Sequence, residues 1–142
     1  MEPVTLPETL TSIGAMLDAN KLPVDDLSEP GVELFCKCEG DQPVAAIGLE
    51  RRGTSGLLRS LVVLDEKRGQ GIAQSLVSEV EAEARQTGLS GLYLLTETAD
   101  EFFSKAGYER ADRSAAPAAI KETRQFSSLC PASATFMCKS FI

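Results

Sequence analysis

The chain has 142 residues, of which 43% are hydrophobic and 25% charged, and its formal net charge is −7. These values predict one soluble globular domain over residues 1–142, and they exclude a membrane span, which needs about 18 consecutive apolar residues. The acidic balance argues against nucleic acid and membrane as partners. The chain has no histidine, which excludes Ser-His and Cys-His nucleophiles and any histidine-bearing zinc site.

The N-terminus and the cysteines indicate the compartment. Residues 1–4 lack the basic region and apolar run of a secretory signal, so a cytoplasmic protein is expected. The four cysteines lack Cys-x-x-Cys spacing and are expected to be reduced thiols. Cys36 and Cys38 lie two apart in a predicted strand and therefore face the same side, which leaves a soft-metal site as the alternative.

Hydrophobic periodicity and turn residues predict the elements in chain order. An extended segment and a helix (4–22) and a short helix (22–27) precede a strand hairpin (32–39 and 44–50) and a third strand (57–64). An amphipathic helix (72–87), a buried strand (91–96), a helix (99–106) and a terminal strand (134–141) follow, with short helices expected within 115–120 and 126–129.

The turn that joins the third strand to the amphipathic helix has the features of an anion site. Gly69 and Gly71 allow positive φ and close backbone approach, so successive N–H groups can point into one concavity. Unpaired amides and the dipole at a helix start favour an anion such as a phosphate there. An ordinary strand-turn-helix corner explains the same glycines, so the turn alone leaves both interpretations open.

Two motifs resemble one family. Arg68-x-x-Gly71-x-Ala73 is similar to the signature of the GCN5-related N-acetyltransferases (GNAT), in which this turn holds the pyrophosphate of acetyl-coenzyme A (acetyl-CoA). Later, Ala-Asp-Glu-Phe-Phe-Ser-Lys-Ala-Gly-Tyr at residues 99–108 resembles the family pattern Ala-x-x-x-Tyr-x-x-x-Gly-Phe. With both motifs in order, the chain is identified as a member of the GNAT superfamily.

The resemblance implies an α/β (α+β) fold. Its single mixed, mostly antiparallel sheet is splayed between the fourth and fifth strands and flanked by helices. Strands that diverge leave backbone groups without partners, which is costly when they are buried. Pantetheine fills that gap in the family, so acetyl-CoA is expected as cosubstrate, with no metal.

The same resemblance implies the coenzyme contacts. The backbone of residues 61–63 would bond the pantetheine and acetyl group, and the amides of residues 69–74 the pyrophosphate. A fixed N–H near the thioester carbonyl, assigned to Val63, would stabilise developing oxyanion charge. The full expected set is Leu61, Val62, Val63, Arg68, Gly69, Gln70, Gly71, Ile72, Ala73, Gln74, Thr98 and Phe103.

Phe103 departs from the family pattern. Many members have a tyrosine there as general acid near the coenzyme sulfur, and a phenylalanine cannot donate a proton. Because a thiol with a pKa near 8.5 is already a tolerable leaving group, direct transfer is expected with water, a hydroxyl of Thr96 or Thr98, or no dedicated acid. The sequence favours simple packing as the explanation of Phe103.

The C-terminal half resembles enzymes that acetylate amino acids. Residues 93–99 and the following Phe102-Phe103 are similar to N-acetylglutamate synthases, and residues 117–120, 125–134 and 137–139 to arsenic-resistance-operon N-acetyltransferases. This resemblance implies a small-molecule amine substrate: the α-amine of an amino acid or of a toxic glutamate analogue of the arsinothricin or phosphinothricin kind. The alternatives are a protein or peptide N-acetyltransferase and a non-catalytic acetyl-CoA-binding regulatory module. A homodimer is a further family expectation.

An α-amino acid needs a cation for its carboxylate. Arg59, on the strand beside the expected thioester, can contact a carboxylate through two N–H groups. Arg124, Gln125 and Ser128 are later candidates, together with Thr96. The alternative is a solvent-facing strand residue for Arg59 and a surface charge on a helix for Arg124.

The ammonium of the acceptor must lose a proton before attack. Glu50, on the strand before Arg59, and Glu97, at the end of the buried strand, lie near the expected cleft and are candidate bases. Glu97 is also explained as the start of the next helix. Deprotonation through water remains an equal alternative.

Overall fold

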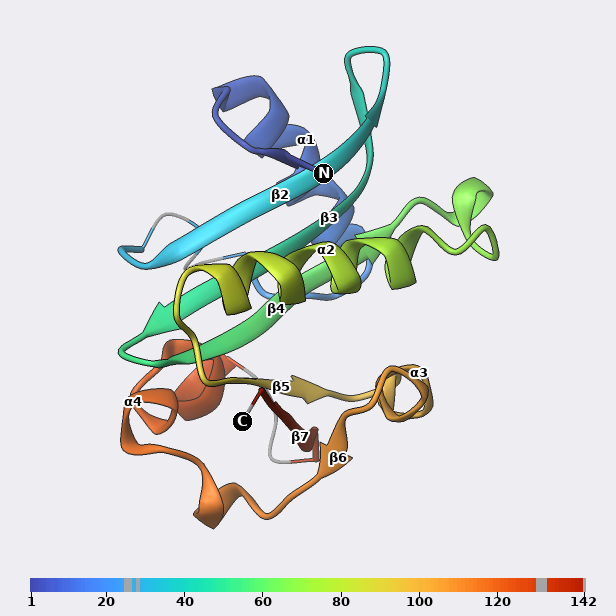
Figure 1. The fold of residues 1–142 in the computed structure, drawn as a ribbon. Coiled ribbons are helices and arrows are strands. Elements are labelled where there is room, and N and C mark those ends of the chain that lie inside the picture. The colour runs from blue at the N-terminus through green and yellow to red at the C-terminus, as the bar shows by residue number, and fades with distance from the viewer. Residues whose placement is uncertain (25–26, 28, 130–132, 142) are drawn as a thin grey trace.

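A seven-stranded mixed sheet forms the centre of the molecule (Figure 1). The computed structural model describes residues 1–24, 27, 29–129 and 133–141. Along the sheet the strands lie in the order β1-β2-β3-β4-β5-β7-β6. Their bounds are β1 (Glu2–Pro3), β2 (Val32–Glu39), β3 (Gln42–Arg52), β4 (Ser55–Val63), β5 (Gly91–Thr96), β6 (Glu109–Arg110) and β7 (Thr135–Ser140).

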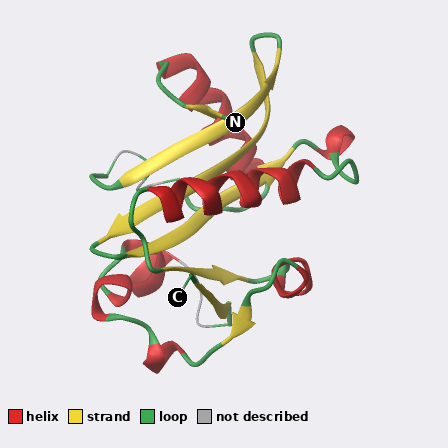
Figure 2. Ribbon diagram, in the orientation of Figure 1, coloured by secondary structure: helices red, strands yellow, loops and turns green. Residues whose placement is uncertain are grey.

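Two longer helices and several short ones complete the fold (Figure 2). The α-helices are α1 (Pro7–Ala19), α2 (Ile72–Gln86), α3 (Asp100–Lys105) and α4 (Ala118–Lys121). Single 3₁₀ turns form η1 (Asp65–Lys67) and η2 (Arg113–Ala115), and η3 (Gln125–Leu129) is of π type. Within the described ranges no helix combines the length and the apolar character that crossing a membrane requires.

Helices α1 and α2 cover opposite faces of the sheet. Ala45 and Ile47 of β3 pack in one cluster with Val77 of α2, whereas Ala46 packs in another with Ile13 of α1. Alternate residues of a strand face opposite sides, so β3 is buried on both faces. This explains why β3 reads as a nearly continuous apolar run.

Strands β4 and β5 form the only parallel pair in the described sheet, and they separate soon after they meet. Their register joins Ser55 to Gly91 and ends at Leu57 and Tyr93. Beyond that point β4 stays paired with β3 and β5 with β7, so the two halves of the sheet diverge (Figure 1). The mixed, splayed sheet expected from the sequence is therefore confirmed.

Some local expectations need correction. Within the expected helix at 22–27, residues 22–24 are not helical, and Asp25 and Asp26 lie outside the described residues. Pro23 is consistent with this, because a proline disfavours helical geometry in the residue before it. Residues 109–110 form β6, which was missed, because a two-residue strand has no periodicity to detect.

Candidate active site

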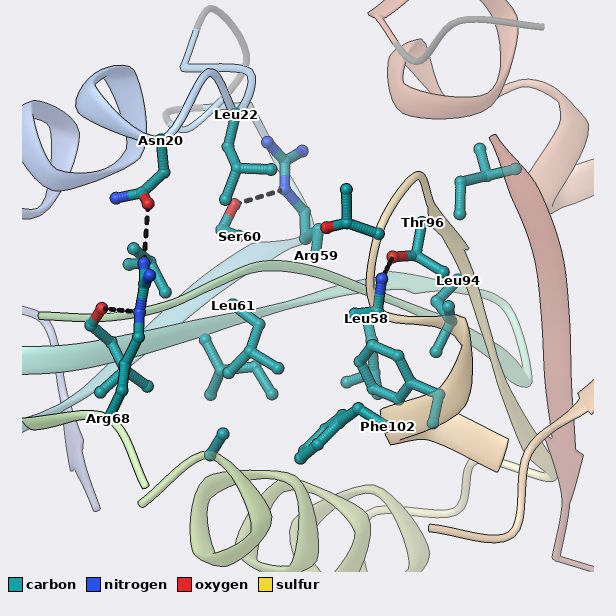
Figure 3. Close-up of a pocket in the computed structure, with 18 residues that line it drawn as sticks. Asn20, Leu22, Leu58, Arg59, Ser60, Leu61, Arg68, Leu94, Thr96 and Phe102 are labelled. Atoms are coloured by element: carbon teal, nitrogen blue, oxygen red, sulfur yellow. Dashed lines mark hydrogen bonds between the residues drawn. The ribbon is translucent and has the colours of Figure 1, made fainter. Parts of the chain in front are cut away.

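The divergence of β4 and β5 opens a cavity of about 460 Å³ (Figure 3). Residues 58–63 of β4 line one side, and residues 94–96 of β5 with Phe102 of α3 line the other. A second cavity of about 350 Å³ lies at the turn before α2, and it shares Val63, Arg68, Ala73 and Phe102 with the first. The two cavities therefore form one elongated site.

A β-bulge in β4 shapes the middle of the site. Ala46 pairs with Val62 and Gly48 with Arg59, so two β4 residues lie opposite one residue of β3. Ser60 has a φ of 59°, a left-handed conformation that costs a non-glycine residue about 1–2 kcal/mol. Bulges change the direction of the side chains that follow them, and this one lies where β4 leaves β5.

The backbone of Val63 faces the gap between the strands. The N–H of Leu64 donates to the carbonyl of Val44 on β3 at 2.9 Å. Successive N–H groups of a strand point to opposite edges, so the Val63 N–H is directed away from β3. The Val63 carbonyl accepts a hydrogen bond from Nε of Arg68 at 3.2 Å. This edge of β4 therefore offers polar groups to a ligand.

The turn before α2 is an open concavity. Gly69 and Gly71 have φ values of 81° and 78°, and an added Cβ would meet no atom within 4 Å at Gly69 and only Gln74 Oε1, at 3.9 Å, at Gly71. The N-cap residue Gly71 supplies no side-chain cap, and the N–H of Ser75 is the first to bond to its carbonyl. The preceding amides of the helix lack intrahelical partners, which suits an anion.

Arg68 joins the two cavities. Its Nη2 donates to Oδ1 of Asn20 at 2.8 Å, and its Nη1 lies 3.0 Å from Oδ1 of Asp65. Asn20 follows the end of α1 and lines the first cavity beside Leu22, as Figure 3 shows. Asn20 is not among the candidate site residues predicted from the sequence, so its place in the site was missed.

Arg59 lines the cavity and forms a buried ion pair. Its Nη1 lies 3.2 Å from Oε1 of Glu50, and the two side chains are 0% and 1% exposed. Its Nε donates to Oγ of Ser60 at 3.2 Å, and Nη2 of Arg52 lies 2.5 Å from the other oxygen of Glu50. In Figure 3 Arg59 points to the side opposite Phe102.

The end of β5 brings further expected residues to the same cavity. Thr96 and Thr98 line it, and Oγ1 of Thr96 accepts a hydrogen bond from the N–H of Ala99 at 2.9 Å. Phe103 is buried and also lines the cavity, with its ring edge-on to those of Phe102 and Tyr108. Position 103 therefore provides no phenol hydroxyl that could donate a proton.

Most, but not all, of the site residues predicted from the sequence line the two cavities. Of the expected coenzyme-binding residues, all except Gln70 line one of the two cavities, and Arg59 and Thr96 line the first. The linings do not include Glu50, Glu97, Arg124 or Gln125. Glu97 is exposed, and Arg124 pairs with Glu29 at 2.7 Å. The side chain of Ser128 lies outside the described part of the structure.

A buried polar network behind the site was not anticipated. The hydroxyl of Tyr108 donates to Oε2 of Glu81 on α2 at 2.8 Å, and Nζ of Lys139 on β7 lies 3.1 Å from the same oxygen. Burial, reinforced by the Glu81 carboxylate, raises the pKa of Tyr108. The phenol therefore stays protonated, and the network links β7 and the segment that follows α3 to α2.

The sequence matches one family model. Residues 30–110 match the model described as the acetyltransferase (GNAT) domain. Comparison with curated proteins gives no match.

Solved structures with the same fold belong to several kinds of acetyltransferase. Tetrahymena GCN5 superposes with a TM-score of 0.79 at 14% identity, over 99% of this chain and 95% of that one. N-acetylglutamate synthase from Neisseria gonorrhoeae, complexed with coenzyme A and N-acetyl-glutamate, gives 0.78 at 12% identity, over 100% of this chain and 34% of that one. An aminoglycoside 6′-N-acetyltransferase complexed with coenzyme A gives 0.74 at 19% identity, over 100% and 98%.

These identities establish the fold, and the family follows from the domain model. Because that model covers more than half of the 142 residues, the protein belongs to the GNAT acetyltransferase family and is an acetyl-CoA-dependent N-acetyltransferase.

Proposed function

We propose that this enzyme acetylates the α-amine of a small amino acid or glutamate analogue, recognised by its carboxylate. The observation that carries the proposal is the buried Arg59 guanidinium in the wall of the β4–β5 cavity. A guanidinium fork matches a carboxylate in geometry as well as charge.

The donor half of the site fits acetyl-CoA. The turn around Gly69 and Gly71, with the first amides of α2, is suited to the pyrophosphate, and the free edge of β4 at residues 61–63 to the pantetheine. Acetyl-CoA supplies an acetyl thioester to the attacking amine. We assign to the Val63 N–H the stabilisation of negative charge on the carbonyl oxygen.

Proton removal from the acceptor is a separate step. We assign Glu50 to positioning, because its carboxylate is enclosed by two arginines and does not line the cavity. Glu97 is exposed beside Thr98, so the ammonium proton leaves to Glu97 or directly to water. Substitution Glu97→Gln distinguishes the two, since only a side-chain base predicts a large fall in kcat that depends on pH.

The similar structures support more than one acceptor class. The Neisseria enzyme is crystallised with N-acetyl-glutamate, which supports an amino acid, whereas the aminoglycoside enzyme and GCN5 have comparable TM-scores. Overall fold therefore does not select the acceptor, and the proposal of an amino acid rests on the Arg59 guanidinium in the cavity wall. The acidic chain would also attract a basic peptide, which makes a peptide the necessary competitor.

The decisive experiment measures release of free thiol from acetyl-CoA with a panel of amines. The panel contains L-glutamate, phosphinothricin, arsinothricin, a basic peptide and, as matched control, glutamate with its α-carboxylate converted to an amide. We expect turnover with at least one amino acid and a large loss with the amide. Turnover with the peptide alone, or equal rates for glutamate and its amide, would overturn the proposal.

A further inference from the structure

A second cluster of ligating side chains lies away from the acetyl-transfer cavity. Within the described residues, Glu2, Cys36 and Cys38 each offer one ligand atom, and these three atoms lie within 4.8 Å of one another. Cys36 and Cys38 are on β2, and Glu2 on β1 is the register partner of Cys36. None of the three lines either cavity of the active site.

The two sulfurs share the face of the sheet that α1 covers. Cys36 packs in the same cluster as Ile13 and Leu17 of α1, and Cys38 lies against that cluster. Lys37 between them faces the other side, where its Nζ donates to Oγ of Ser75 on α2 at 2.9 Å. Both sulfurs therefore lie on the same face of β2, and the side chain of Lys37 does not lie between them.

The spacing of the sulfurs fits a tetrahedral metal. The two Sγ atoms are 3.6 Å apart. Two thiolates at a Zn–S distance of about 2.3 Å and a tetrahedral angle are about 3.8 Å apart, so binding requires little movement of the strand. We propose that Cys36, Cys38 and Glu2 form a site for a soft divalent cation of the Zn²⁺ type.

The burial of the ligands defines the form of the site. Cys36 is buried, Cys38 is half-buried and Glu2 is exposed, so the protein encloses the cation on one side only. Three protein ligands leave a fourth tetrahedral position for water. On binding, the two thiols release their protons to solvent and the carboxylate completes the protein ligand set.

A cation bound at this site would stabilise the edge of the sheet. Strand β1 has only two residues and forms the edge of the sheet. A cation held by Glu2 and both cysteines would fasten this edge strand to β2. Since a ligand that binds only the folded state stabilises it, the bound cation should raise the melting temperature of the full chain.

The test titrates the reduced full-length protein with Cd²⁺, whose bond to thiolate has a charge-transfer absorption, and with Zn²⁺ followed by melting temperature. We expect one Cd²⁺ per chain and a higher melting temperature with Zn²⁺. Removal of outer-shell partners alone costs about 10–100-fold in metal affinity, so Cys38→Ser, which removes a direct ligand, should cost more than about 100-fold. Glu2→Gln should weaken binding without abolishing the thiolate absorption.

A double variant, Cys130→Ser with Cys138→Ser, is the matched control, because it removes two cysteines and keeps the proposed pair. It should bind Cd²⁺ as the unmodified protein does. Three results would overturn the inference: no Cd²⁺ binding by the reduced protein, unchanged affinity in a folded Cys38→Ser variant, or loss of binding in the control. None of these measurements depends on the acceptor amine, so the proposed function is tested separately.

Discussion

Nη1 of Arg59 lies 3.2 Å from Oε1 of Glu50, and neither side chain is more than 1% exposed, although Arg59 belongs to the wall of the cavity. A buried ion pair is costly to desolvate, and it is therefore weak evidence for stability. We infer that this ion pair serves to position Arg59, because Glu50 fixes the direction of the guanidinium that we propose binds the acceptor carboxylate. Arg52 holds the second oxygen of Glu50 from the surface side.

Substitution Glu50→Gln should therefore affect both folding and acceptor binding. It removes the carboxylate that contacts both Arg52 and Arg59, and breaking a buried pair costs about 3–5 kcal/mol of unfolding free energy. The KM for the acceptor should rise, whereas the Kd of coenzyme A should stay unchanged. Urea denaturation and steady-state kinetics measure the two effects.

Glu33→Gln is the matched control, because Glu33 pairs with Arg51 at 2.6 Å but is 46% exposed. An exposed pair contributes about 0–1 kcal/mol, so this variant should be nearly as stable as the unmodified protein. If both substitutions have the same small effect on stability and neither changes KM, the positioning role of Glu50 is wrong.

Substitution Gly71→Val tests the pyrophosphate turn. The residue has a φ of 78°, and a side chain there would extend into the open concavity before α2. We expect a stability loss of about 1–2 kcal/mol from the left-handed backbone and, in addition, a large loss of coenzyme A affinity. Isothermal titration calorimetry with coenzyme A measures the second effect.

Gly53→Val separates strain from obstruction. Gly53 has a φ of 62° and equally open surroundings, but it lies in the turn between β3 and β4. It should lose comparable stability and keep its affinity for coenzyme A. Equal affinities of the two variants for coenzyme A would show that the turn around Gly71 does not bind the coenzyme.

Substitution Phe103→Tyr asks whether the missing phenol limits the reaction. General acid catalysis contributes about 10²–10⁴-fold where it is needed. The coenzyme thiol, with a pKa of about 8.5, leaves without strong assistance, so we expect kcat to change less than about tenfold. Profiles of kcat against pH for the two proteins provide the measurement. A rise of about 100-fold or more, with a new ionisation on the alkaline side, would show that the enzyme lacks a required acid.

The coenzyme half of the site could be predicted because its signals are local. Gly69, Gly71 and Ala73 lie in one strand-turn-helix unit, and their spacing together with the later motif at residues 99–108 predicts a turn with open amides. The splay of the sheet was predicted from the family resemblance, and the short register of β4 with β5 confirms it. Hydrophobic periodicity and apolar runs also predicted most helices and strands, since these elements bury one face or, as in β3, both faces.

The acceptor half could not be predicted to the same degree. The bulge at Ser60 depends on how β4 pairs with β3, and the partnership of Arg59 with Glu50 crosses between these strands. A sequence pattern assigns a residue to a face but does not identify its partner. We therefore propose that Glu50, a candidate base from the sequence, instead positions Arg59.

The network of Tyr108, Glu81 and Lys139 joins α2 to the β5–β7 half of the sheet, and it leads to a prediction about stability. Burial raises the pKa of Tyr108, so its hydroxyl remains a donor to the Glu81 carboxylate over the working range of pH. Tyr108→Phe removes this bond to a charged acceptor and should cost about 1.5–3 kcal/mol of unfolding free energy in urea. Tyr93→Phe is the control, because its half-buried ring stacks on Phe136 and the substitution preserves that contact. Equal stabilities of the two variants would mean that Lys139 alone satisfies Glu81 and that the two halves of the sheet are held together by apolar packing.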